Sequence, residues 1–196
     1  MLDGLEEDRK ACKQKIYDFN QLPPSRQSKE APQMIKNIFG KTGENVWVEA
    51  PFHCDYGWNI EVGENFYSNY NLTILDVGKV TCGKNVQIAP NVSIYTAGHP
   101  VHPDSRNSGY EYGIPVTVGD NVWIGGNTVI LPGVTVGSNV VIGAGSVVSK
   151  DIPDNTIAAG NPCKVIRKIT DEDRIYYFKK QKFDDEAWEE VKNKNK

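Results

Sequence analysis

The chain has 196 residues, a formal net charge of -3 at pH 7 and an isoelectric point near 5.7. This mildly acidic balance argues against a nucleic-acid-binding surface, which needs clustered positive charge. No apolar run approaches the roughly 20 residues that span a bilayer. The acidic first residues lack the basic start and apolar centre of a signal peptide.

Cysteine usage points to a reducing compartment. The four cysteines lie far apart and show neither paired spacing nor a zinc pattern: Cys12, Cys54, Cys82 and Cys163. Free thiols are typical of the cytosol, where disulfides are rare. We therefore expect a cytoplasmic protein with no metal.

Residues 1–45 are expected to be helical. Apolar residues recur at helical spacing: Leu5, Cys12, Ile16 and Phe19. The segment Leu22-Pro-Pro-Ser25 breaks this pattern. Four apolar residues before a Gly40 stop signal indicate a second helix: Met34, Ile35, Ile38 and Phe39.

From about residue 46 the chain repeats every six residues. In the first repeats, apolar residues recur at this spacing at Ile60, Phe66 and Leu72. After a shift of two residues, the spacing continues at Val80, Val86 and Val92. The later repeats carry a β-branched residue every sixth position: Val116, Val122, Thr128, Val134 and Val140. A second apolar residue follows two positions along: Val118, Ile124, Ile130, Val136 and Ile142. A short β-branched strand followed by a Gly/Asn turn, repeated without drift, predicts a parallel β-helix of triangular coils over residues 46–168.

A long segment, roughly residues 97–115, interrupts the repeat. Ejecting such a loop costs closure entropy and returns no stacking between coils. Loops of this length usually carry function. His99 and His102 lie at its start, in Thr96-Ala-Gly-His-Pro-Val-His102.

The repeat weakens near Ala158-Ala-Gly-Asn-Pro162, and the tail from 169 to 196 is expected to be helical. Thr170-Asp-Glu-Asp173 resembles a capping box. It predicts the start of a C-terminal helix that carries Ile175 and Phe178.

Taken together, several segments resemble the hexapeptide-repeat acetyltransferases, especially the maltose and galactoside O-acetyltransferase group. These segments are the hexads themselves, Gly98-His-Pro-Val-His102, Asn121-Val-Trp-Ile-Gly125, Gly143-Ala-Gly-Ser146 and Ala159-Gly-Asn-Pro-Cys-Lys-Val-Ile166. The resemblance implies a left-handed parallel β-helix that assembles as a homotrimer, with active sites between neighbouring subunits. The general rule for parallel crossovers favours the opposite hand, so the hand depends on the resemblance alone. The implied reaction moves an acetyl group from acetyl-CoA to a sugar hydroxyl.

Transfer to an alcohol needs a base for the hydroxyl proton, and histidine suits this role near neutral pH. The resemblance assigns it to His99, with His102 the next candidate. Two histidines three apart also suggest a metal or a carbonic-anhydrase-like site, but such a zinc needs three histidine ligands. The remaining histidine, His53, lies a coil and a half away or more, so we expect no metal.

The resemblance also implies the remaining site residues. The oxyanion of the tetrahedral intermediate would meet the backbone N–H of Gly126, and Trp123 would lie near the coenzyme. Acceptor hydroxyls would meet Asp55, Tyr67, Asn69 and Asp76, and Glu111 in the loop would orient His99 or a partner. Val77 follows Asp76 where the galactoside type tends to carry a second acid, which is closer to the maltose type. Coenzyme contacts would come from Gly126, Ala144, Ser149, Lys150, Lys164 and Arg167.

Alternatives remain open on the acceptor side. The acceptor is a sugar or, as the runner-up, an amine, an antibiotic or serine; a third class is an inactive repeat scaffold. Relatives usually carry an upstream Gly-x-x-Tyr-Asp-like element that reaches the acceptor pocket, and this chain starts at Met1 without it. Acceptor specificity is therefore not fixed by the resemblance.

Overall fold

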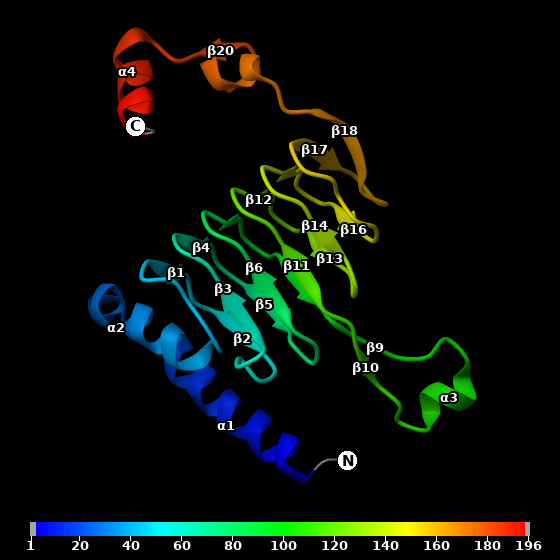
Figure 1. Cartoon of the computed structure of the whole chain (residues 1–196). Helices are drawn as coiled ribbons and strands as arrows, with labels where there is room; N and C mark the ends of the chain where they lie inside the picture. The colour runs from blue at the N-terminus through cyan, green and yellow to red at the C-terminus, as the bar shows by residue number, and fades with distance from the viewer. Residues whose placement is uncertain (1–2, 195–196) are drawn as a thin grey trace.

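Three sheets, parallel except for the last strand of one, enclose one apolar interior and form a triangular solenoid (Figure 1). This computed structural model describes residues 3–194. The chain passes through sheets A, B and C in a fixed cycle, so each coil adds one strand to each sheet. The predicted β-helix of hexapeptide coils is confirmed.

The sheets contain the following strands. Sheet A holds β3 (Ile60–Val62), β6 (Val80–Cys82), β11 (Val116–Val118) and β14 (Thr135–Val136). Sheet B holds β1 (Val46–Val48), β4 (Phe66–Ser68), β7 (Gln87–Ile88), β12 (Trp123–Ile124), β15 (Val141–Ile142), β17 (Thr156–Ala159) and β18 (Lys164–Lys168). Sheet C holds β2 (Phe52–Cys54), β5 (Leu72–Leu75), β8 (Ser93–Tyr95), β13 (Val129–Ile130) and β16 (Val147–Val148).

The hexad residues form inward columns because the strands stack in register. In sheet B, Ile124 pairs with Ile88 on one side and Ile142 on the other, and all three are buried. The alternate column of the same sheet faces outward and includes Tyr67 and Trp123. Stacking identical apolar columns is what makes each short coil stable.

The corner between sheets A and B repeats an asparagine in the left-handed region, with φ between 56° and 58° at Asn65, Asn85, Asn121, Asn139 and Asn155. Asparagine tolerates this conformation better than most residues. Each side-chain amide donates to the next along the axis, from Asn45 to Asn155, at 2.8 to 3.3 Å. We call this edge the amide corner.

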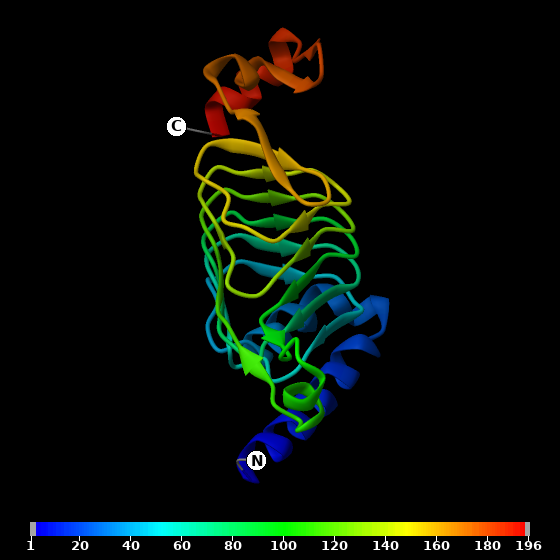
Figure 2. The same cartoon turned by 90° about the vertical axis from the view of Figure 1, so that its right-hand side faces the viewer.

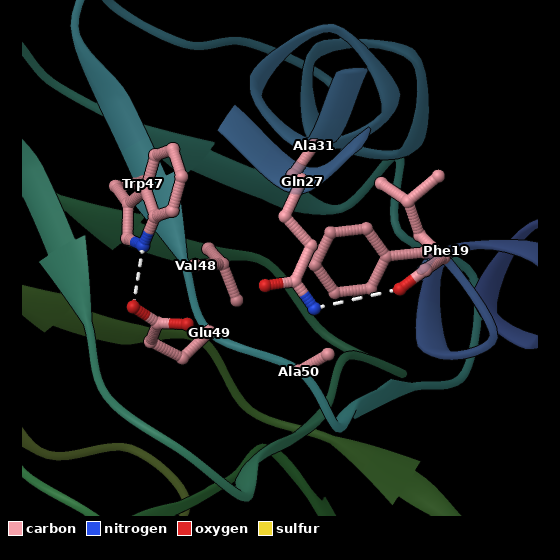
Figure 3. Close-up of a pocket in the computed structure, with 8 residues that line it drawn as sticks. Phe19, Gln27, Ala31, Trp47, Val48, Glu49 and Ala50 are labelled. Carbon is pink, nitrogen blue, oxygen red and sulfur yellow. Dashed lines mark hydrogen bonds between the residues drawn. The ribbon is translucent and has the colours of Figure 1, made fainter. Parts of the chain in front are cut away.

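Two helices cover the first coil, as predicted: α1 (Asp3–Asn20) and α2 (Pro24–Ile38). Phe39 packs edge-on against Phe52 with ring centroids 5.5 Å apart. Figure 3 shows the seam between the helices and the first coil, where Phe19 points toward Val48 and Ala50 around a small cavity. The Trp47 indole donates to Glu49 there at 2.8 Å.

The predicted loop leaves the solenoid as a hairpin that projects beside α1 (Figures 1 and 2). It contains the antiparallel strands β9 (Ala97–Gly98) and β10 (Tyr112–Gly113), with the short helix α3 (Pro103–Asn107) between them. At the opposite end of the solenoid, β18 runs antiparallel to β17 and leads into the tail.

The tail corrects one expectation. The capping box at Thr170 and Asp173 is present, but it opens only the short 3-10 helix η1 (Asp171–Ile175). Phe178 lies in the hairpin of β19 (Tyr176–Phe178) and β20 (Gln181–Lys182), and the helix α4 (Asp185–Lys194) comes later. Three consecutive aromatic residues favour a strand, and Lys179 turns the hairpin with a φ of 49°. No helix within residues 3–194 is both long and apolar enough to cross a membrane.

Candidate functional site

The predicted site residues gather along two edges of the triangular solenoid. We call the edge between sheets C and A the loop corner; it is built from residues 55–59, 76–79, 96–115, 131–134 and 149–151. We call the edge between sheets B and C the glycine corner; it is built from residues 49–51, 69–71, 89–92, 125–128 and 143–146. The strands of sheet C separate the two corners.

His99 follows directly after β9 at the base of the projecting hairpin. Its Nδ1 lies 3.0 Å from the backbone oxygen of Tyr110 on the opposite arm. A carbonyl oxygen only accepts, so we assign the proton to Nδ1, which leaves the Nε2 lone pair free. The side chain is 52% exposed, so Nε2 is open to a substrate. The hydrogen bond thus favours the Nδ1–H tautomer and leaves Nε2 exposed.

Glu111 lies close to His99 but does not orient it through a hydrogen bond. Its Oε1 is 4.0 Å from His99 Nε2, beyond hydrogen-bonding distance. The orienting contact comes instead from the Tyr110 carbonyl. Sequence reasoning missed this contact because a backbone acceptor leaves no mark on residue type. Glu111 therefore contributes a nearby negative charge to this side of the hairpin.

His102 has a different position. It precedes α3 as its N-cap, where its Nδ1 accepts from the backbone N–H of Asp104 at 3.2 Å. This bond satisfies one of the free N–H groups at the start of the helix. His102 therefore supports the hairpin in the way that polar N-cap residues do.

An open cleft lies between α1 and the hairpin, next to His99. Its lining residues are Leu5, Glu6, Arg9, Lys10, Lys13, Tyr56, Gly109, Tyr110 and Glu111. Arg9 reaches across the seam to the predicted acceptor residue Asp55, at 2.7 Å, and lies over the Tyr56 ring. Sequence reasoning missed the polar residues of α1, because the helical pattern identified only its buried face.

Asp76 lies beneath Asp55 and is fully buried. Its carboxylate accepts from the backbone N–H groups of Asp55, Tyr56 and Gly57 at 2.7 to 3.0 Å. Burial raises the pKa of Asp76, and the three hydrogen bonds oppose this rise. The carboxylate therefore shapes the turn that presents Asp55.

The glycine corner holds the predicted oxyanion donor. Gly126 N–H has no hydrogen-bond partner within residues 3–194, whereas the neighbouring Gly125 N–H donates to Ile142 at 2.8 Å. Ala144 is exposed one coil further along the same corner. Asn69, on an earlier coil, donates its own N–H to Ile88 and accepts from Tyr70 through its side chain. A free backbone donor on an open corner is the geometry that oxyanion stabilisation needs.

The predicted coenzyme residues divide between the two edges. Ser149 and Lys150 are exposed on the loop corner. Lys164 and Arg167 lie on β18, at the end of the sheet that also carries Tyr67 and Trp123. Arg167 makes a two-pronged ion pair with Asp173, at 2.7 and 2.8 Å.

One chain therefore forms two groups and not a single site. The loop corner gathers Asp55, Asp76, His99, Glu111, Ser149 and Lys150. The glycine corner and sheet B gather Tyr67, Asn69, Trp123, Gly126, Ala144, Lys164 and Arg167. His53 lies on an outward position of β2. Among the described residues, no group of three or more His, Cys, Asp or Glu side chains is arranged to hold a metal ion.

Comparisons with known proteins identify the family of the chain. Residues 115–150 match the family model for the bacterial transferase hexapeptide, and residues 2–43 match the maltose acetyltransferase hexapeptide capping motif. The chain is 53% identical to the galactoside O-acetyltransferase of Escherichia coli K12 over 182 residues, which cover 93% of this chain and 89% of that protein.

Solved structures give the same result. A galactoside acetyltransferase in complex with coenzyme A superposes with a TM-score of 0.91 at 53% identity, covering 94% of this chain and 92% of that one. A maltose O-acetyltransferase from Clostridium difficile 630 superposes with a TM-score of 0.83 at 53% identity, covering 85% and 89%.

Proposed function

This chain belongs to the hexapeptide-repeat acetyltransferases of the galactoside and maltose O-acetyltransferase type, and from that membership we propose how it transfers acetyl from acetyl-CoA to a sugar hydroxyl. The observation that carries the proposal is the fixed tautomer of His99. Its Nδ1 is held by the Tyr110 carbonyl and its Nε2 faces solvent beside a cleft.

His99 Nε2 takes the proton of the acceptor hydroxyl as the oxygen attacks the thioester carbonyl carbon. A carbon–oxygen bond forms, and the carbonyl oxygen becomes an oxyanion. The unpartnered Gly126 N–H donates to this oxyanion. The carbon–sulfur bond then breaks, and the leaving sulfur takes the proton back from His99. No nucleophile motif accompanies His99 in the sequence, so no covalent enzyme intermediate is needed and the attack is direct.

Acceptor and coenzyme bind on opposite sides of the reacting carbonyl. Asp55, Tyr67, Asn69 and Glu111 offer hydrogen-bonding groups to acceptor hydroxyls, with Asp76 supporting Asp55 from below. The pantetheine arm follows Gly126 and Ala144, and Trp123 packs beside it. Ser149, Lys150, Lys164 and Arg167 receive the polar and phosphate groups, because charged donors bind phosphate strongly.

The active unit is a homotrimer in the cytoplasm. His99 and Gly126 lie on different corners of one solenoid, so a single chain does not present base and oxyanion donor to one carbonyl. A threefold arrangement brings the loop corner of one copy against the glycine corner of the next. Trp123, 55% exposed on sheet B, offers apolar surface for that contact.

Release of free coenzyme A from acetyl-CoA tests the activity against a panel of acceptors. Galactosides and maltose should support release, while an amine, an aminoglycoside antibiotic and serine should give only the background rate. Preferential release with a non-sugar acceptor would reassign the acceptor class. No release with any acceptor would favour an inactive scaffold.

Mixed trimers test the shared site. His99→Ala and Asn69→Ala variants are each expected to be nearly inactive alone. When the two are co-expressed, roughly a quarter of the sites in randomly mixed trimers should combine His99 from one copy with Asn69 from the next. Activity should therefore return on mixing. Persistent inactivity of verified mixed trimers would place both residues in one chain's site.

A further inference from the structure

Two cysteines face each other where α1 meets the first coil. Cys12 Sγ, on α1, lies 3.6 Å from Cys54 Sγ, the last residue of β2. Cys12 is 3% exposed and Cys54 is half-buried. Both are free thiols. Cys82 and Cys163 are buried in the solenoid, and no other sulfur pair within residues 3–194 makes a hydrogen bond.

The pair lies in the middle of a preformed seam. At one end, the Asn20 side chain donates to the Phe52 carbonyl and accepts from the Phe52 N–H, both at 2.9 Å. At the other end, Arg9 pairs with Asp55 at 2.7 Å. Contacts on both sides of the sulfurs fix the position of α1 against β2. The sulfurs thus need only a local side-chain movement to reach the roughly 2.05 Å of a disulfide.

The two thiols are chemically different. The hydrogen bond from Cys54 lowers the pKa of the Cys12 thiol, and the same bond together with burial raises the pKa of Cys54. These opposite shifts favour Cys12 as the sulfur that ionises, with the Cys54 S–H as the donor. The thiolate is the reactive form of cysteine, and Cys54, which is only partly buried, is the less enclosed of the two sulfurs.

We propose that Cys12 and Cys54 are a modification site, a dithiol that a hydroperoxide converts to an intramolecular disulfide locking α1 onto the first coil. The Cys12 sulfur attacks the hydroperoxide, the O–O bond breaks, and an alcohol or water leaves with the released proton. Cys12 becomes a sulfenic acid. Cys54 sulfur then attacks Cys12 sulfur, the S–O bond breaks, and the oxygen leaves as water with the Cys54 proton. Two thiols are oxidised and one hydroperoxide is reduced.

The disulfide would restrict the movement of α1, which lines one side of the cleft beside His99. Arg9, Lys10 and Lys13 line that cleft from α1, within one turn of Cys12. The disulfide spans residues that are 42 apart in sequence, and cross-links of long segments stabilise the folded form most. In the oxidised protein, we expect the population in which α1 has separated from the first coil to fall by at least about tenfold.

The test treats the purified full chain with hydrogen peroxide, counts thiols under denaturing conditions and maps disulfides by mass spectrometry without reduction. Two of the four thiols should disappear, in a 12–54 linkage that dithiothreitol reverses. Trypsin should then cut after Lys10, Lys13 and Lys15 about tenfold more slowly. The Cys54→Ser variant should stop at a Cys12 sulfenic acid, trapped by dimedone, and should show no slower cleavage. Cys82→Ser is the matched control and should behave as wild type.

Three results would overturn the proposal. Retention of all four thiols at a peroxide dose that oxidises glutathione is the first. A linkage between two chains, or one that includes Cys82 or Cys163, is the second. The third is a 12–54 linkage that leaves cleavage of α1 unchanged, because the bond would then lock nothing. None of these results depends on acetyl transfer.

Discussion

The solenoid and the hairpin that projects from it differ in how their residues are held in place. Coil residues such as Ile124 and Ile130 are fully buried, and each is repeated above and below by an equivalent residue. In the hairpin, residues 99–115 are half-buried or exposed, and single contacts such as His99 to Tyr110 hold them. The repeated contacts of the coils stabilise the fold, whereas the single contacts of the hairpin position individual side chains such as His99. Substitutions in the two regions should therefore change different measurements.

The largest effect is expected at His99, in the region of solitary contacts. His99→Ala should lower acetyl transfer by about 10²–10⁴-fold, because a general base contributes that much to rate. Thermal unfolding and acetyl-CoA binding should stay close to wild type. His102→Asn is the matched control, since asparagine also caps helices well, and it should keep transfer within about threefold. Transfer by His99→Ala within threefold of wild type would remove the base assignment.

A core substitution should give the reverse pattern. Ile130→Ala removes a fully buried side chain between Ile94 and Val148 and should cost about 2–5 kcal/mol of unfolding free energy. Turnover per folded chain should be unchanged at moderate temperature. Chemical denaturation measures the first quantity and coenzyme A release the second. Thr117→Ala, an exposed change on β11, should cost less than about 0.5 kcal/mol. An equal loss of unfolding free energy in both variants would contradict the conclusion that the buried columns stabilise the solenoid.

The tail should show a smaller and more selective effect. Arg167→Ala should raise the apparent KM for acetyl-CoA by roughly tenfold to a hundredfold, the loss of one charge-assisted phosphate contact. Acetyl-pantetheine lacks the nucleotide phosphates, so its KM should change far less. Asp173→Asn leaves the guanidinium in place and serves as the control for tail order. Equal losses with both donors would make Arg167 a structural residue.

The smallest expected effect is the loss of tail stability at low pH. Hydrogen bonds from Arg167 and the Thr170 backbone hold the pKa of Asp173 well below its usual 3.8. The native tail therefore binds fewer protons than the unfolded tail below that pH. The stabilisation is present above pH 3.8 and is lost as pH falls below it. The pair is exposed, so solvent screens it and its contribution to stability should be small. Hydrogen exchange of residues 170–176 should report the loss, and Asp173→Asn should remove the dependence. An unchanged pH profile in that variant would exclude Asp173 as its source.

The sequence predicted the solenoid well because its signal is repeated in every coil. The β-branched positions, the interruption at 97–115 and the two N-terminal helices follow from local patterns. The tail hairpin was missed because the capping box at Thr170 fits a 3-10 turn as well as a longer helix. Local pattern alone did not separate these outcomes.

The candidate site was less accessible to sequence reasoning. The separation of His99 and Gly126 onto different corners depends on counting coils in three dimensions. The ion pair of Arg9 with Asp55 joins residues 46 apart, and neither residue type marks the other. The Tyr110 carbonyl that sets the His99 tautomer is a backbone group, which every residue carries. Such long-range and backbone contacts leave no periodic trace.

The two ends of the solenoid also have a consequence for how the protein behaves at high concentration. Only the first and last coils have a strand edge with no neighbouring coil, and an open parallel edge is a template on which another molecule's coil can stack into a fibre. At the first coil, α1 and α2 lie over this edge (Figure 2). At the last coil, β18 crosses β17 in the antiparallel direction, so a second solenoid meets a strand of the wrong polarity. The same short strand that carries Lys164 and Arg167 thus covers the sheet B edge at that end and opposes parallel stacking there.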